Sequence, residues 1–156
     1  MTLKHLVYLL IFISCTPTQD TPDPIYIPST HSYTSDELTY IDALNSVRVS
    51  NGVDRLLLSD DLSSLAKSHV DYLSFNQVIN HYNYGDRLYS IESIGFNGLS
   101  ENVAYGYTNV NSLISAWLNS VGHRDNLLDI RHTYHGFAIG LDVDGSYYYV
   151  HLFSRK

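Results

Sequence analysis

AWLNSVGHRDNLL, residues 116–128, is the most informative run of this sequence. Its first half completes a series of apolar residues at helical spacing, which predicts a helix with one buried face. This series comprises Val110, Leu113, Ile114, Trp117 and Val121. Glycine is a common helix stop, so we expect the helix to end at Gly122. His123 follows next to that helix end, in the kind of segment where functional side chains concentrate.

Two more helices are predicted closer to the N-terminus. Thr34-Ser35-Asp36-Glu37 is a capping box, in which the threonine hydroxyl and the glutamate carboxylate each accept a hydrogen bond from an otherwise unpaired amide. We therefore expect a helix over residues 35–51, ended by Gly52. A second helix is expected to begin after Ser59-Asp60-Asp61. Its buried face comprises Leu62, Leu65, Ala66, His69 and Leu73.

The middle of the chain gives weaker signals. Residues 76–100 are polar and contain several asparagines and glycines, with a short helix expected near residues 86–94. A strand is expected over residues 101–107.

The C-terminal part has the two-residue period of a strand. Asp144-Gly145 is a strong hairpin turn, and residues 147–153 are the expected partner strand. The first strand carries apolar residues at alternate positions: Phe137, Ile139, Leu141 and Val143. Helices first and an antiparallel hairpin last predict one α+β domain over residues 34–156, with helices packed on a small sheet.

Residues 1–14 have the pattern of an export signal peptide. Lys4 gives a basic start, and the apolar run 6–13 is far shorter than the roughly 20 residues that cross a bilayer as a helix. Cys15 follows the small Ser14, as the lipid-bearing cysteine of a bacterial lipoprotein follows its signal. We predict an exported protein held at a membrane of the cell envelope by a lipid on Cys15. The alternative is an ordinary signal peptide and a secreted protein.

Residues 15–33 are predicted to be an extended tether between this cysteine and the domain. All four prolines of the chain fall in it, which excludes a helix or an inner strand. Cys15 is the only cysteine of the chain, so the domain over residues 34–156 has no disulfide and depends on its core.

The composition narrows the class of partner. The formal charge is -7, and the 9 Lys and Arg residues are scattered along the chain. A general nucleic-acid binder needs clustered basic residues to displace phosphate counterions, so nucleic acid is excluded as a partner. Aromatic residues at 13% favour a folded core over disorder.

Most histidines have an ordinary structural interpretation. His31 lies in the tether and is expected in solvent, and His69 is expected in the core with a hydrogen bond to the backbone. His132 and His135 are expected at the surface. His151 shares a strand face with tyrosines, so it is expected to be packed or half-exposed.

His81 and His123 differ, because each lies beside a helix end among glycines and asparagines. Glu101 is a lone carboxylate in a neutral segment, and such a group needs a partner or a shifted pKa. These three residues are the candidates for a functional site.

Five segments, in order, resemble the CAP superfamily (SCP-like proteins) in the form found in exported bacterial proteins. They are Leu44–Arg48 leading to Gly52, Leu65–His69, Glu101–Gly106, Ala116–Leu128, and Gly136–Gly140 with Tyr149–Phe153. The resemblance covers residues 38–154. It implies a three-layer α-β-α sandwich around a small antiparallel sheet, with a cleft on one side.

In many members of this superfamily, two histidines and two acidic residues line the cleft, and the histidines hold a divalent ion. By position, the histidines fall on His81 and His123 and the first acid on Glu101. The second acid is replaced by Ser120, which leaves a less charged site. His69 matches a structural histidine of the family.

The resemblance leaves several interpretations open. His81 and His123, with Glu101, form a set suited to Zn²⁺ or another divalent cation. Glu101 can instead orient a histidine, or all three can form a hydrogen-bonded network without an ion. We favour a binding or interaction module with a lipid or protein ligand in the cleft. A metal-assisted hydrolase with Glu101 as base is one alternative, and a lipid or sterol binder is another.

Overall fold

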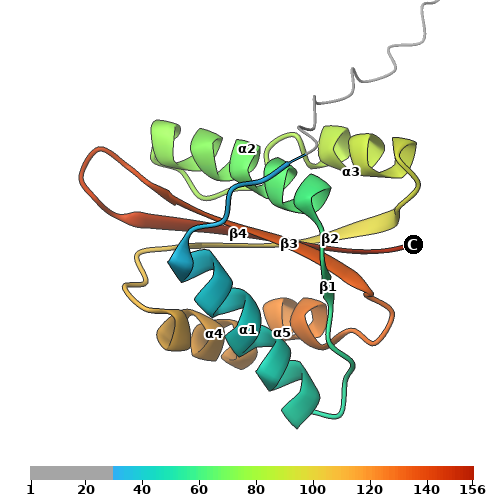
Figure 1. The fold of residues 1–156 in the computed structure, drawn as a ribbon. Coiled ribbons are helices and arrows are strands. Elements are labelled where there is room, and N and C mark those ends of the chain that lie inside the picture. Colours follow the sequence, from blue (N-terminus) through green and yellow to red (C-terminus); the bar gives the residue numbers. More distant parts are fainter. Residues whose placement is uncertain (1–29) are drawn as a thin grey trace, which may run out of the picture.

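The structure is a computed structural model that describes residues 30–156 (Figure 1). The predicted signal peptide, the predicted lipidation site at Cys15 and the predicted tether as far as residue 29 lie outside the described residues.

Five helices form the outer layers of the domain. On one face of the sheet lie α2 (Asp60–Asn76) and α3 (Tyr84–Ser93). On the other lie α1 (Ser35–Ser50), α4 (Val110–Asn119) and α5 (Val121–Leu128), as Figure 1 shows. The three-layer α-β-α sandwich expected from the sequence is therefore confirmed.

The central layer is a four-stranded sheet in the order β1-β3-β4-β2. β3 (Tyr134–Leu141) and β4 (Tyr147–Arg155) form the predicted hairpin, and β2 (Asn97–Tyr105) pairs antiparallel with β4 at the edge. The short β1 (Leu57–Leu58) pairs parallel with β3, so the sheet is mixed where a wholly antiparallel one was expected. Two exposed leucines give no alternating pattern that could have predicted β1.

The capping box predicted at the start of the first helix is present. Thr34 Oγ1 accepts from the amide of Glu37, and Glu37 Oε2 accepts from the amide of Thr34. The other oxygen of Glu37 accepts from the amide of Ile139 over 3.0 Å. A residue that begins α1 therefore also holds that helix against β3.

Side chains on the two faces of the sheet form two separate core clusters. Residues Phe137, Tyr149 and Phe153 pack with Tyr40 and Trp117 on the α1/α4 face. The second cluster lies between the opposite face and α2, and includes Leu62, Leu65, Ala138, Val150 and Leu152. Alternation along β3 and β4 assigns each strand residue to one cluster or the other.

The predicted helix stop at Gly122 is wrong. α4 ends at Asn119, and Ser120 is extended, with φ -99° and ψ 121°, before α5 begins at Val121. Gly122 lies inside the first turn of α5. One extended residue suffices to turn the chain, which a search for glycine or proline does not detect.

Three histidines are more buried than the sequence suggested. The side chain of His31 is 6% exposed, because it packs beside Tyr33 and lies 3.7 Å from a carboxylate oxygen of Glu37. His135 is completely buried and His132 is partly buried. β3 enters the sheet at Tyr134, so His135 faces the core instead of solvent.

Candidate functional site

Glu101 lies on the edge strand β2, with its carboxylate 1% exposed. His81, in the loop between α2 and α3, brings Nδ1 to 2.6 Å from Oε1 of Glu101. Because a carboxylate only accepts, this ring nitrogen carries the proton and donates it. Sequence analysis singled out both residues, and the structure places them in direct contact.

Arg87 is the second partner of Glu101, and sequence analysis missed it. From α3 its Nη2 donates to Oε1 over 2.8 Å and lies 2.7 Å from Oε2, while Nη1 donates to the carbonyl of Tyr82. The guanidinium is 3% exposed, and burial lowers the pKa of Arg87 while Glu101 raises it. Arg87 is the only Lys or Arg in residues 76–100, which is the signal that could have found it.

His69, which is buried, completes the cluster from α2, whereas His81 is exposed. Nε2 of His69 donates to the carbonyl of Asn80 over 3.0 Å, as the backbone-bonded core interpretation predicted. The same nitrogen lies 3.7 Å from Oε1 of Glu101. Burial and the charge of Arg87 lower the pKa of His69, which favours a neutral ring. The cluster around Glu101 is therefore one carboxylate, one guanidinium and two imidazoles.

His123 lies on the opposite face of the sheet from Glu101. Adjacent strand residues point to opposite faces, and Asn102, next to Glu101, is the one that donates to the carbonyl of His123 over 3.1 Å. Nδ1 of His123 lies 2.9 Å from Oγ of Ser120. No hydrogen bond among the described residues joins His123 to His81 or Glu101.

The two candidate histidines still influence each other around the sheet edge. Burial lowers the pKa of His123, and a positive charge on His81 lowers it further. His123 and Ser120 line a hollow of about 270 Å³ beside Trp117, whereas His81 and Glu101 do not line it. The candidate residues thus flank β2 from both sides.

The expected three-ligand metal site does not fit this arrangement. Among residues 30–156, no group of three or more His, Cys, Asp or Glu side chains is placed to hold a metal ion. Glu101 faces a buried guanidinium, whose positive charge opposes a second cation at the same carboxylate. The arrangement contains only the His81–Glu101 part of the hydrogen-bonded network that the sequence left open, with Arg87 rather than His123 as the other partner of the carboxylate.

A second polar cluster escaped sequence analysis altogether. The hydroxyl of Tyr40 lies 2.8 Å from Nδ1 of His151, whose Nε2 lies 3.0 Å from Nδ1 of His135. All three side chains are completely buried. His135 and His151 occupy alternating positions with aromatic residues on β3 and β4, so their period is visible in the sequence, but their pairing is not.

The α-β-α layers and the edge-strand cluster define a class: small α+β domains with a histidine and glutamate cluster at the edge of the sheet. The chain belongs to the cysteine-rich secretory protein (CAP) family, whose sequence profile matches residues 41–153. The resemblance drawn from the five sequence segments is thereby confirmed.

Relatives of this chain include bacterial proteins. Over 119 residues it is 30% identical to the uncharacterized membrane protein YlbC of Bacillus subtilis, an alignment that covers 74% of this chain and 33% of YlbC. The chain therefore spans about a third of that relative.

Solved structures share the fold. An outer surface protein from Borrelia burgdorferi is 26% identical with a TM-score of 0.71, covering 81% of this chain and 99% of that protein. An extracellular SCP-domain protein from Bacillus anthracis is 26% identical with a TM-score of 0.66, covering 81% of this chain and 45% of that one. Within residues 30–156, no helix is both long and apolar enough to span a membrane.

Proposed function

We propose that this protein is an exported CAP-domain binding module in which the Glu101 cluster holds α3 and the loop before it against the edge strand β2. This proposal rests on the hydrogen bonds that Glu101 accepts within the protein. Its Oε1 lies within 2.8 Å of both Arg87 and His81, and the carboxylate is 1% exposed. A general base needs a lone pair that faces a reacting proton, and Glu101 directs its oxygens at two internal donors.

Export is supported by the sequence and by the relatives. The run 6–13 and Cys15 have the pattern of a lipoprotein signal, and relatives are described as membrane, extracellular or outer surface proteins. We propose anchoring through a lipid on Cys15. Radiolabelled palmitate should enter the wild-type protein during expression and be absent from Cys15→Ser, and label retained in that variant would contradict the anchor.

Metal content and turnover test the binding role against metal-assisted hydrolysis. The purified protein should hold less than one equivalent of any divalent ion by elemental analysis, and added Zn²⁺ should leave its melting temperature unchanged. Stoichiometric metal that is lost in both His81→Ala and His123→Ala would overturn the network. So would peptidase or esterase turnover that is lost in Glu101→Gln.

Lipid binding is a second candidate function, favoured by one specific observation. A hollow of about 530 Å³ lies between α1 and α4, and apolar side chains of Ala43, Val47, Ile114 and Leu118 line it. Displacement of a fluorescent fatty acid measures this function. Ile114 is buried, so Leu118→Asp is the better substitution, and it should abolish the signal.

A further inference from the structure

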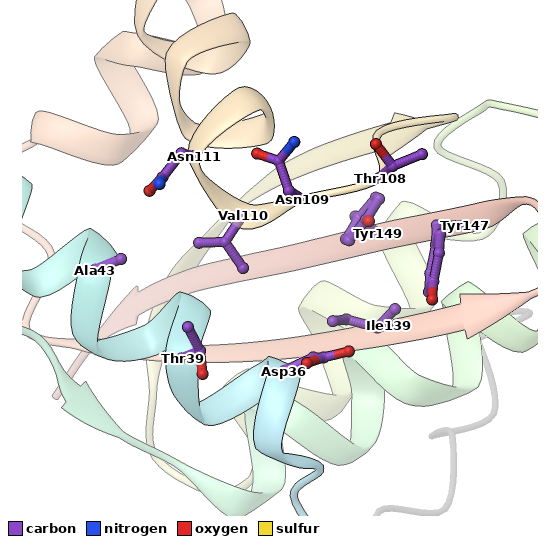
Figure 2. Close-up of a pocket in the computed structure, with 10 residues that line it drawn as sticks. All are labelled: Asp36, Thr39, Ala43, Thr108, Asn109, Val110, Asn111, Ile139, Tyr147 and Tyr149. Carbon is purple, nitrogen blue, oxygen red and sulfur yellow. The ribbon is translucent and has the colours of Figure 1, made fainter.

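A separate pocket lies on the α1/α4 side of the sheet, away from the carboxylate of Glu101. Figure 2 shows it between the first turns of α1, the turn that leads into α4, and the strands β3 and β4. Its volume is about 340 Å³, within the range of small-molecule sites. None of the residues discussed above as catalytic or metal-binding candidates lines it, so this pocket needs its own explanation.

A single carboxylate supplies the charge of the pocket. Asp36 is the only Asp, Glu, Lys, Arg or His in the lining. It is exposed, and none of the described residues gives it a hydrogen bond or an ion pair. Asp36 lies in the first turn of α1. An unpaired carboxylate in a pocket without a cation favours a positively charged ligand.

The aromatic wall of the pocket suits such a ligand. Tyr147 and Tyr149 lie two residues apart on β4, with ring centroids 6.1 Å apart and ring planes 26° from parallel. The hydroxyl of Tyr149 donates to the carbonyl of Tyr107 over 2.7 Å, and Tyr149 is buried, whereas Tyr147 is only partly buried and presents more of its ring to the pocket. Aromatic faces attract organic cations through the ring quadrupole. The charge of Asp36 also acts on Tyr149. Burial, Tyr147 and Asp36 together raise the pKa of Tyr149 to about 12.

The remaining residues of the lining favour one kind of cation over another. Ala43, Val110 and Ile139 present apolar groups, as Figure 2 shows. The Oδ1 of Asn109 accepts from the amide of Ser112 over 2.9 Å, which occupies both that oxygen and one amide at the start of α4. Thr39, Thr108 and Asn111 complete the lining with polar groups. The preference for a quaternary ammonium therefore rests on the apolar and aromatic walls, which fit its methyl groups.

We propose that this pocket binds a quaternary ammonium group, as in choline. Asp36 compensates the charge, the two tyrosines provide the aromatic face, and the apolar walls contact the methyl groups. The proposal deepens the binding role proposed above and rests on it. The pocket shares Ala43 and Asn111 with the apolar hollow between α1 and α4, so the ammonium group can come from a free small molecule or from a lipid headgroup.

Calorimetric titration of the purified full-length protein with choline tests the proposal. The control ligand is 3,3-dimethyl-1-butanol, which has the same shape without the charge. Choline should bind at least about ten-fold more tightly than this alcohol. Equal binding of the two ligands, or no binding of choline, would overturn the ammonium site.

Substitutions locate the binding. Asp36→Asn and Tyr147→Leu should each weaken choline binding by about ten-fold. Asp61→Asn is the matched control, because Asp61 is also an acidic residue in a helix first turn but does not line the pocket. Circular dichroism and melting temperature verify that each variant is folded. Choline affinity that is the same in all three variants would place the binding elsewhere and contradict the proposal.

A third arm identifies the source of the ammonium group. Lysophosphatidylcholine below its micelle concentration should bind more tightly than choline if the natural ligand is a lipid, and no more tightly if it is a free molecule. Either result is compatible with the pocket. The two proposals fail separately: absent choline binding removes the ammonium site, while metal-dependent turnover lost in Glu101→Gln removes the binding role.

Discussion

Burying the carboxylate of Glu101 costs free energy that its partners must offset. A carboxylate isolated from water is strongly disfavoured, and a buried pair is stable only with good geometry and further hydrogen bonds. Arg87 and His81 supply that geometry at 2.8 Å and 2.6 Å. The cluster therefore contributes a defined arrangement of α3 and β2 more than net stability, and removing one member should be far more costly than removing a matched pair.

Arg87→Met should destabilise the protein by about 3–5 kcal/mol, because it leaves the buried Glu101 without its guanidinium. Urea unfolding at pH 7 measures the change. The control is Arg55→Met, which removes an exposed ion pair with Asp42 and should cost less than about 1 kcal/mol. The double variant Arg87→Met, Glu101→Gln should recover part of the loss. Equal costs for Arg87→Met and Arg55→Met would contradict the buried pair.

At the level of single residues, the sequence indicates which side chains need a polar partner better than it indicates which residues those partners are. The lone Glu101 signalled a need for a partner, and the segments around His81 and His123 signalled proximity to helix ends. The strand predicted over residues 101–107 implies that Glu101 and Asn102 point to opposite faces. The sequence did not show that this strand lies at a sheet edge with α5 on the side of Asn102, which separates His123 from the carboxylate. That separation depends on β2 pairing with β4, a contact between residues far apart in the chain.

The packing of one helix on the sheet depends on a missing side chain. α2 crosses β3 at Gly136, where an added Cβ would lie 2.2 Å from the backbone carbon of Leu62 and 2.2 Å from the backbone nitrogen of Ser63. Backbone atoms cannot rotate away as the end of a side chain can. Any residue larger than glycine would therefore separate the helix from the sheet.

Gly136→Ala should destabilise the domain by at least about 3 kcal/mol, because the whole helix must move to admit one methyl group. Gly122→Ala is the control: Gly122 is helical and nothing lies within 4 Å of the added Cβ, so this variant should gain about 0.5–1 kcal/mol. Thermal unfolding of the two variants compares them directly. A Gly136→Ala protein with the same melting temperature as the wild type would show that α2 does not approach β3 this closely.

Elements with a strong local period were predictable, and elements set by tertiary contacts were not. The capping box placed the start of α1 correctly, and the alternation around Asp144-Gly145 gave the hairpin of β3 and β4. The division between α4 and α5 at Ser120 has no such local signal. Asn102, on β2, contacts α5 through the carbonyl of His123 and the amide of Asn126. These contacts hold α5 in place, and they exist only in the folded sheet.

Across the whole molecule, one buried chain of polar groups connects the first helix to the C-terminal hairpin. Tyr40 on α1, His151 on β4 and His135 on β3 follow one another at hydrogen-bond distances of 2.8 Å and 3.0 Å. His151 has a partner at both ring nitrogens. A neutral imidazole in such a position donates with one nitrogen and accepts with the other. With both rings protonated, the N–H of His151 Nε2 and the N–H of His135 Nδ1 would face each other across 3.0 Å, so the fold cannot hold both histidines charged.

This requirement makes the stability of the entire domain depend on pH. Burial and the charges of Arg48 and Arg55 lower the pKa of His135 to about 3, and burial lowers the pKa of His151 well below its usual value. In the unfolded chain both titrate near 6.5. Below that pH the unfolded state binds protons that the native state does not, so stability falls as the pH falls.

The free energy of unfolding should be constant from pH 8 to 7 and should fall by about 2 kcal/mol per buried histidine between pH 6.5 and pH 5. Urea unfolding at a series of pH values measures this slope. His135→Phe keeps an aromatic ring in the core and removes one titrating group, so its slope over that window should be shallower than the wild-type slope. Because His151 titrates in the same direction, some dependence should survive in the variant. A wild-type protein equally stable at pH 7.5 and pH 5 would show that both rings take up protons in the fold, although two protonated rings would oppose N–H groups across the 3.0 Å contact.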